Sequence, residues 1–143
     1  QLYLGDSGSY LLGFSFSIFL ITIYKFNQDI SPFFIILLLW YPSYENLFSI
    51  IRKNIIKRSP MYPDAKHMHQ LIFFYINKKY NLSTFLANTL TAQMINIYNL
   101  IIFLIGLNFI TNSKIQIFLI LLSVSMYSLA YIKLFKFKYQ KSV

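Results

Sequence analysis

Residues 33–51 read "FFIILLLWYPSYENLFSII", and this stretch decides the fold class. It is long and apolar enough to cross the hydrocarbon core of a bilayer as a single helix. The preceding Pro32 suits the first turn of a helix, so the sequence predicts a transmembrane helix from about Pro32 to Ile51. Pro42 removes a backbone donor late in this helix, which predicts a kink there.

Three further apolar stretches accompany this one. We predict membrane spans over residues 9–24, 85–110 and 115–135, joined by short polar loops and by a basic connection over 52–84. Hydrophobic residues make up 57% of the chain and charged residues only 12%, which is far from the composition of a soluble domain. The sequence therefore predicts an all-α integral membrane protein with about four transmembrane helices.

The basic residues predict how the protein lies in the membrane. The net charge is +9, and eleven of the thirteen Lys and Arg residues fall in the 52–84 connection or after residue 132. The positive-inside rule predicts that both regions lie in the cytoplasm, and this clustering of charge beside membrane spans argues against nucleic acid as a partner. With four spans, the start of the chain lies on the cytoplasmic side as well.

The beginning of the chain falls inside a motif rather than at a methionine. We interpret residues 1–143 as the C-terminal part of a single polytopic membrane domain, with an N-terminal part expected before Gln1. The chain has no cysteine, so it can form neither a disulfide nor a thiolate metal site.

The first candidate site is "GDSGSYLLG" at residues 5–13. In one interpretation Asp6 or Ser7 caps a helix start. In the other, free N–H groups face a phosphate, Gly8 allows its close approach, and Asp6 holds a Mg²⁺ ion. The spelling "GDSG" does not indicate a serine protease, because here it opens a membrane helix without triad partners.

The second candidate site is "YPSYENLFSIIR" at residues 41–52. Glu45, Ser49 and Arg52 follow an i, i+4, i+7 spacing and share one helix face. Glu45 either pairs with a basic side chain at the membrane surface or has a functional role, which is the default expectation for an ionisable group in a membrane helix.

The third candidate site is "SPMYPDAKHMHQ" at residues 59–70, where Asp64, Lys66, His67 and His69 lie within six positions. Zinc would need further ligands that the sequence does not offer nearby. Attraction to anionic lipid would explain the lysine but not the two histidines. Recognition of a diphosphate would explain the cationic and neutral hydrogen-bond donors together.

Polar side chains also interrupt the predicted 85–110 span. They are Asn88, Thr89, Gln93, Asn96 and Asn99. Polar groups in a membrane helix commonly form hydrogen bonds to neighbouring helices, and we predict that role for these five.

Taken together, "LGDSGSYLLGF", "PSYE" and "SPMYPDAKHMH" resemble the C-terminal portion of the polyprenyl-phosphate N-acetylhexosamine-1-phosphate transferases. The resemblance covers nearly all 143 residues. It implies transfer of a sugar-1-phosphate from a UDP-sugar to polyprenyl phosphate, with Mg²⁺ as cofactor and release of UMP. Such a reaction starts a lipid-linked surface polysaccharide or cell-wall precursor. The implied partners are UDP-N-acetylhexosamine, polyprenyl phosphate, membrane lipid and, for a homodimer, a second copy.

The resemblance also implies roles for individual residues. Asp6 matches a catalytic aspartate that holds the metal, and His67 and His69 match the first and third positions of an H-x-H-H motif. The implied substrate-binding residues are Gly8, Ser9, Arg52, Arg58 and Lys66. Gln70 departs from the pattern, because many members have a further histidine there. An aspartate pair is expected upstream of Gln1.

A second hypothesis comes from a different functional class. The chain could be a non-catalytic membrane protein whose basic 52–84 connection binds anionic lipid or a protein partner. This hypothesis requires neither Asp6 nor the histidines. A transporter would need ionisable groups near the middle of the membrane, and Glu45 alone comes close to that position.

Overall fold

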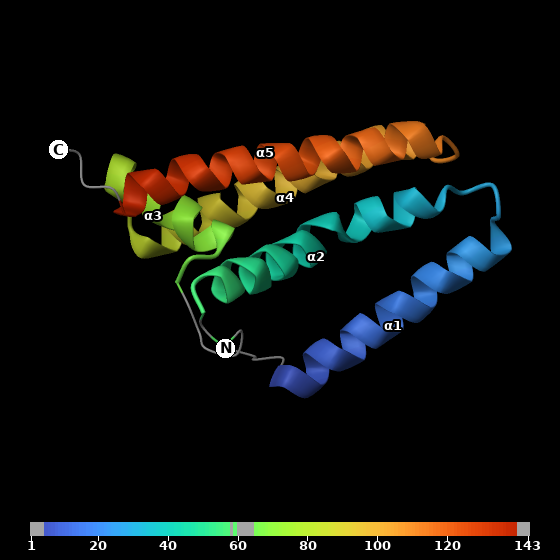
Figure 1. Cartoon of the computed structure of the whole chain (residues 1–143), viewed down its shortest axis with the longest axis horizontal. Helices are drawn as coiled ribbons and strands as arrows, with labels where there is room; N and C mark the ends of the chain where they lie inside the picture. The colour runs from blue at the N-terminus through green and yellow to red at the C-terminus, as the bar shows by residue number, and fades with distance from the viewer. Residues whose placement is uncertain (1–4, 58, 60–64, 140–143) are drawn as a thin grey trace.

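The computed structural model describes residues 5–57, 59 and 65–139, with only the backbone of residues 5, 6 and 9. Within these ranges the chain is helical and contains no strand (Figure 1). Its helices are α1 (Gly5–Phe26), α2 (Pro32–Ile55), α3 (Met68–Tyr80), α4 (Thr84–Asn108) and α5 (Ser113–Tyr139).

Three of these helices, α2, α4 and α5, are long and apolar enough to cross a membrane. The described apolar part of α1, Tyr10–Phe26, is shorter. The predicted all-α membrane fold is therefore confirmed, with three full-length candidate spans and a shorter one. The predicted span limits agree with the helices to within a few residues at each end.

Helix α3 is the element that the sequence prediction missed. The 52–84 stretch was expected to be a polar connection, but residues 68–80 form a helix that packs against α4 and α5. Its 13 residues are too few to cross a bilayer, and its last turn carries Lys78 and Lys79. The two histidines consequently lie at a helix start, His67 at the N-cap and His69 in the first turn, rather than in a loop.

Helices α2, α4 and α5 form a bundle that is joined at both ends. At one end Ser31 donates its backbone N–H to the carbonyl of Ile110 at 2.9 Å, and its hydroxyl lies 2.8 Å from that of Ser113. At the other end the Arg52 side chain reaches Tyr131 on α5. Figure 1 shows the first turn of α1 at the same end of the molecule as α3.

The α4–α5 junction is closed by buried polar contacts. The amide nitrogen of the fully buried Gln116 donates to the carbonyls of Gly106 and Phe109, at 2.7 and 2.8 Å. Each of these carbonyls, at the C-terminal end of α4 and its C-cap, also accepts a backbone N–H, from Phe109 and Asn112 respectively, so the Gln116 amide adds a second hydrogen bond to each. A Cβ on Gly106 would come 2.5 Å from Cδ2 of Leu37, so glycine permits the close approach of α2 and α4.

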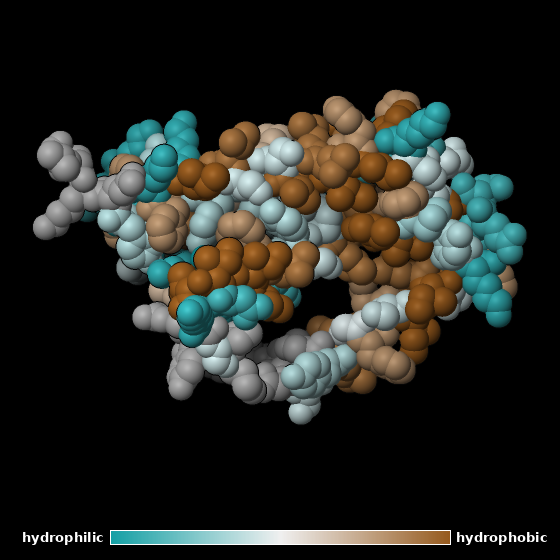
Figure 2. All heavy atoms as spheres, viewed as in Figure 1, coloured by the Kyte–Doolittle hydropathy of each residue, from teal (hydrophilic) through white to brown (hydrophobic). Residues whose placement is uncertain are grey.

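Helix α1 makes far fewer contacts with the rest of the described chain. Leu20 is the buried side chain of its described part, while apolar side chains such as Phe14 and Ile21 are exposed. Figure 2 shows an open gap between α1 and the α2–α5 bundle, with apolar side chains on the outer faces. Exposed apolar faces of this kind suit lipid or further membrane helices.

Among the described residues, the polar side chains of α4 do not form the hydrogen bonds that were predicted for them. Thr89 and Asn99 donate to carbonyls one turn back in their own helix. Asn88, Gln93 and Asn96 are exposed and have no hydrogen bond to other described residues. The buried face of α4 instead carries Ala87, Thr91, Ile102 and Gly106. The predicted interhelical hydrogen bonds are therefore not formed within the described part of the chain.

Candidate functional site

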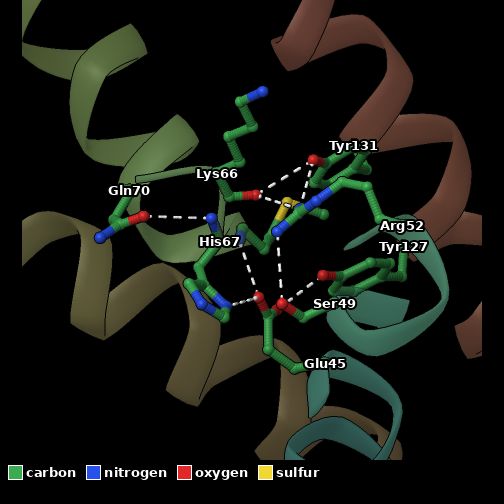
Figure 3. Close-up of polar contacts among 9 residues, drawn as sticks. Glu45, Ser49, Arg52, Lys66, His67, Gln70, Tyr127 and Tyr131 are labelled. Atoms are coloured by element: carbon green, nitrogen blue, oxygen red, sulfur yellow. Dashed lines mark hydrogen bonds and ion pairs between the residues drawn. The ribbon is translucent and has the colours of Figure 1, made fainter. Parts of the chain in front are cut away.

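Glu45 is the centre of a hydrogen-bond network that joins three helices (Figure 3). Its Oε1 lies 3.0 Å from His67 Nδ1 and also accepts from the backbone N–H of Met68 at 3.0 Å. Its Oε2 accepts from the Tyr127 hydroxyl at 2.6 Å. The Glu45 side chain is 12% exposed, and these contacts satisfy a carboxylate that has little access to water.

Arg52 holds the segment before α3 against the bundle. Its Nη1 donates to the carbonyl of Lys66 at 2.7 Å and to the Tyr131 hydroxyl at 2.6 Å, and its Nη2 donates to Ser49 Oγ at 3.3 Å. The Tyr131 hydroxyl also donates to the Lys66 carbonyl, at 3.1 Å. In the structure the guanidinium of Arg52 forms these contacts within the chain (Figure 3). The predicted binding of substrate by Arg52 stays a prediction.

Gln70 has a local structural role. Its Oε1 accepts from the backbone N–H of His67 at 3.1 Å, as the third helical residue does in a capping box. The side-chain oxygen of glutamine is sufficient to accept this hydrogen bond. Gln70, which stands where the motif has a histidine in many members, therefore stabilises the start of α3.

The two histidine rings lie side by side at the start of α3. Their centroids are 5.8 Å apart and their planes differ by 16°. His69 is exposed, whereas His67 is 26% exposed because Glu45 holds it against α2. The surface near α3 thus presents two imidazoles, of which only His67 is anchored by a carboxylate in the described part of the chain.

Lysines and aromatic rings cover the ends of α3 and α5. Lys78 and Lys138 lie over the ring of Phe74, and Lys66 lies over that of Phe135. Lys79 Nζ donates to the Tyr75 hydroxyl at 2.9 Å, and this hydrogen bond raises the pKa of Lys79. Interleaved basic and aromatic side chains are typical of the membrane–water interface.

An apolar groove adjoins the Glu45 network. It has a volume of about 210 Å³ and shares Met68 and Tyr127 with the network. Trp40, Tyr98 and Met126 are among its other lining residues. The site therefore has a polar side at the start of α3 and an apolar side between α2, α4 and α5.

The remaining predicted site residues lie in α1 or outside the described ranges. Helix α1 begins at Gly5, so Asp6 is in its first turn rather than capping it, and the same holds for Ser7. Gly8 is half-buried in that turn. For Asp6 and Ser9 only the backbone is described, and Arg58 and Asp64 fall outside the described residues.

No cluster of three or more His, Cys, Asp or Glu side chains occurs among the described residues. The zinc alternative for His67 and His69 thus gains no third ligand from this part of the chain. In the described part of the chain, the one histidine ring that contacts Glu45 is that of His67, and one carboxylate with one imidazole does not make a zinc site.

Two tyrosines of the network were not predicted from the sequence. Tyr127 and Tyr131 are buried on the same face of α5, one turn apart. In the sequence they stand within an apolar span and look like ordinary core residues. Only their contacts with residues about 80 positions earlier reveal their role.

Comparison with known proteins identifies two related transferases. The chain is 33% identical over 78 residues to the undecaprenyl-phosphate alpha-N-acetylglucosaminyl 1-phosphate transferase of Thermotoga maritima, covering 54% of the chain and 25% of that protein. It is also 33% identical over 76 residues to a Bacillus subtilis protein named "Probable undecaprenyl-phosphate N-acetylglucosaminyl 1-phosphate transferase", covering 52% of the chain and 21% of that protein.

These matches cover only about a quarter of the length of either relative. No family model matches the chain, and no solved structure does. The two relatives nevertheless agree in name with each other and with the family indicated by the three sequence motifs. Over about half of its length the chain is therefore similar to undecaprenyl-phosphate N-acetylglucosaminyl 1-phosphate transferases, which supports its resemblance to the polyprenyl-phosphate N-acetylhexosamine-1-phosphate transferase family.

Proposed function

We propose that this protein transfers an N-acetylhexosamine-1-phosphate from a UDP-sugar to a polyprenyl phosphate in the bacterial inner membrane. The observation that carries the proposal is the 33% identity to two relatives whose names specify an undecaprenyl-phosphate acceptor and an N-acetylglucosaminyl 1-phosphate group. The UDP carrier and the pathway are part of the proposal.

The geometry at the start of α3 supports a phosphoryl-transfer site. This chemistry depends mainly on positioning the phosphates and neutralising their charge. Lys66 and the two histidines lie together at one end of the bundle, next to the lysines and aromatic rings of α3 and α5. A polyprenyl phosphate carries its charged head at the membrane surface, where such a site could meet it.

The apolar groove supports binding of the lipid substrate. It opens beside Met68 and Tyr127, close to the polar residues, and is lined by aromatic and methionine side chains. We propose that it holds the first isoprenoid units of the acceptor, whose phosphate then lies near Lys66 and His67. Non-directional apolar contact suits a hydrocarbon chain that offers no hydrogen bonds.

The proposed reaction uses Mg²⁺, and Asp6 is the residue of this chain proposed to bind it. The described residues contain no cluster of three acidic or imidazole ligands, so they do not form a complete metal site by themselves. Mg²⁺ is commonly held by one or two carboxylates together with substrate phosphates, and we propose Asp6 as one of those carboxylates. The ion would neutralise charge on the transferred phosphate. The residues of the chain would bind and orient the substrates around it.

The proposed reaction is tested by expressing the protein from its gene and assaying it in nanodiscs. The assay contains UDP-N-acetylglucosamine, undecaprenyl phosphate and Mg²⁺, and we expect UMP and a lipid-linked sugar diphosphate to form in equal amounts. UMP formation without the lipid product would point to hydrolysis instead. Absence of both, together with binding to anionic vesicles, would favour the non-catalytic alternative.

The orientation is tested by cysteine labelling, since the chain has no native cysteine. Asn77 lies near the end of α3, and Asn112 lies in the turn between α4 and α5 at the opposite end of the bundle. We expect a membrane-impermeant maleimide to label Asn112→Cys in intact cells and Asn77→Cys only after the membrane is opened. Labelling of residue 77 in intact cells would place the histidines outside and contradict the proposal.

A further inference from the structure

We propose that Glu45 is a positioning residue that fixes His67 through its Nδ1 atom, so that His67 acts on the substrate through Nε2. The identity of the substrate that His67 contacts depends on the proposed function. The orientation inferred for the ring follows from its contact with Glu45 and does not depend on the proposed reaction.

Three groups form hydrogen bonds with the Glu45 carboxylate: the Met68 N–H, the Tyr127 hydroxyl and His67 Nδ1. An N–H of Met68 and a hydroxyl of Tyr127 donate to its two oxygens, at 3.0 and 2.6 Å. An ionised carboxylate is an acceptor only, so His67 Nδ1, 3.0 Å from Oε1, must carry a proton to bond with it. This holds for a neutral imidazole and for an imidazolium alike.

The ring geometry then decides which atom meets the substrate. Nδ1 is directed at a carboxylate that is 12% exposed, while the His67 side chain is 26% exposed. Figure 3 shows the second ring nitrogen on the side away from Glu45. A hydrogen-bonded Nδ1 sets which nitrogen of a histidine is reactive, and here that nitrogen is Nε2.

The position of Glu45 adds a second constraint. It stands on α2, whereas Met68 and His67 begin α3 and Tyr127 belongs to α5. One carboxylate therefore fixes both the start of α3 and the imidazole that precedes it. A carboxylate that orients an imidazole in this way can affect turnover strongly without touching the substrate.

The direct test is the tautomer of His67, measured by nitrogen-15 NMR of histidine-labelled protein in nanodiscs at a pH where the ring is neutral. The chain has two histidines, so a His69→Gln sample assigns the signals. We expect His67 to be the Nδ1–H tautomer. A wild-type His67 that is mainly the Nε2–H tautomer overturns the inference without the need for any variant.

Variants of Glu45 extend the test. Glu45→Ala removes the acceptor, and we expect the Nδ1–H tautomer to lose its dominance and kcat to fall roughly tenfold or more, with KM for the UDP-sugar nearly unchanged. Glu45→Gln retains a carbonyl acceptor and should keep the tautomer and an intermediate kcat. The matched control is Asn46→Ala, which alters the adjacent exposed residue of α2 and should change neither quantity.

The outcomes separate this inference from the proposed function. If the wild-type protein transfers no sugar phosphate but His67 is the Nδ1–H tautomer, the proposed reaction fails and the positioning by Glu45 stands. If the protein is active and Glu45→Ala leaves both the tautomer and kcat unchanged, the positioning role fails and the reaction stands.

Discussion

Asp6→Asn is expected to lower the turnover of sugar-1-phosphate transfer at least roughly a hundredfold, which corresponds to about 2.7 kcal/mol in the barrier. Asparagine keeps the size and much of the hydrogen bonding of aspartate but removes the negative charge. A hard cation such as Mg²⁺ depends on that charge. The measurement is kcat for UMP release in nanodiscs at saturating substrates, repeated over a range of Mg²⁺ concentrations.

The competing explanation for Asp6 is purely structural. A negative charge in the first turn of α1 stabilises the helix by about 0.3–1 kcal/mol, and its loss would affect stability rather than turnover. The matched control is Asp29→Asn, the same substitution in the exposed turn between α1 and α2. Nearly normal activity of Asp6→Asn, with reduced thermal stability, would assign Asp6 to the helix start and remove it from the proposed site.

His67→Ala is expected to lower kcat on the order of a hundredfold, at the lower end of what a positioned acid–base group contributes. His69→Ala is also expected to reduce activity strongly. Gln70→Ala serves as the matched control in the same turn of α3. It removes one capping contact worth about 1 kcal/mol of stability and should leave kcat within a small factor of wild type.

His67→Asn separates chemistry from anchoring. The asparagine amide can take the place of Nδ1 and donate to Glu45, but it offers nothing in the place of Nε2. We expect His67→Asn to fold like wild type, as judged by thermal stability in nanodiscs, and to be as inactive as His67→Ala. Recovery of activity in His67→Asn would mean that His67 serves only to attach α3 to α2. Small and equal effects at His67, His69 and Gln70 would favour the lipid-binding hypothesis.

Local sequence properties predicted the membrane helices well. Apolar length decides whether a segment can cross a bilayer, and the stretches beginning near Pro32, Thr84 and Ser113 have that length. Local properties did not predict α3. Its 13 residues mix apolar and basic side chains, and it is buried at Met68, Leu71 and Ile76 only because α4 and α5 lie beside it.

The sequence predicted several residues of the candidate site but not the hydrogen bonds between them. Glu45 and His67 were each singled out, and pairing of Glu45 with a basic side chain at the membrane surface was one of two interpretations. That the partner is His67, 22 residues away, follows only from the packing of α3 against the bundle. Tyr127 could not be predicted at all, because it stands 82 residues from Glu45 within an apolar span.

The sequence by itself determined the membrane class, the approximate spans, the uneven distribution of positive charge and the family motifs. These properties depend on the length, polarity and order of residues along the chain. The tertiary structure decided that Arg52 holds the Lys66 carbonyl, that Gln70 caps α3, and that Glu45 orients His67. Such contacts depend on which helix faces meet, and a hydrogen bond forms only when donor and acceptor approach to about 3 Å. Spacing along one chain cannot specify that approach between segments that are far apart in sequence.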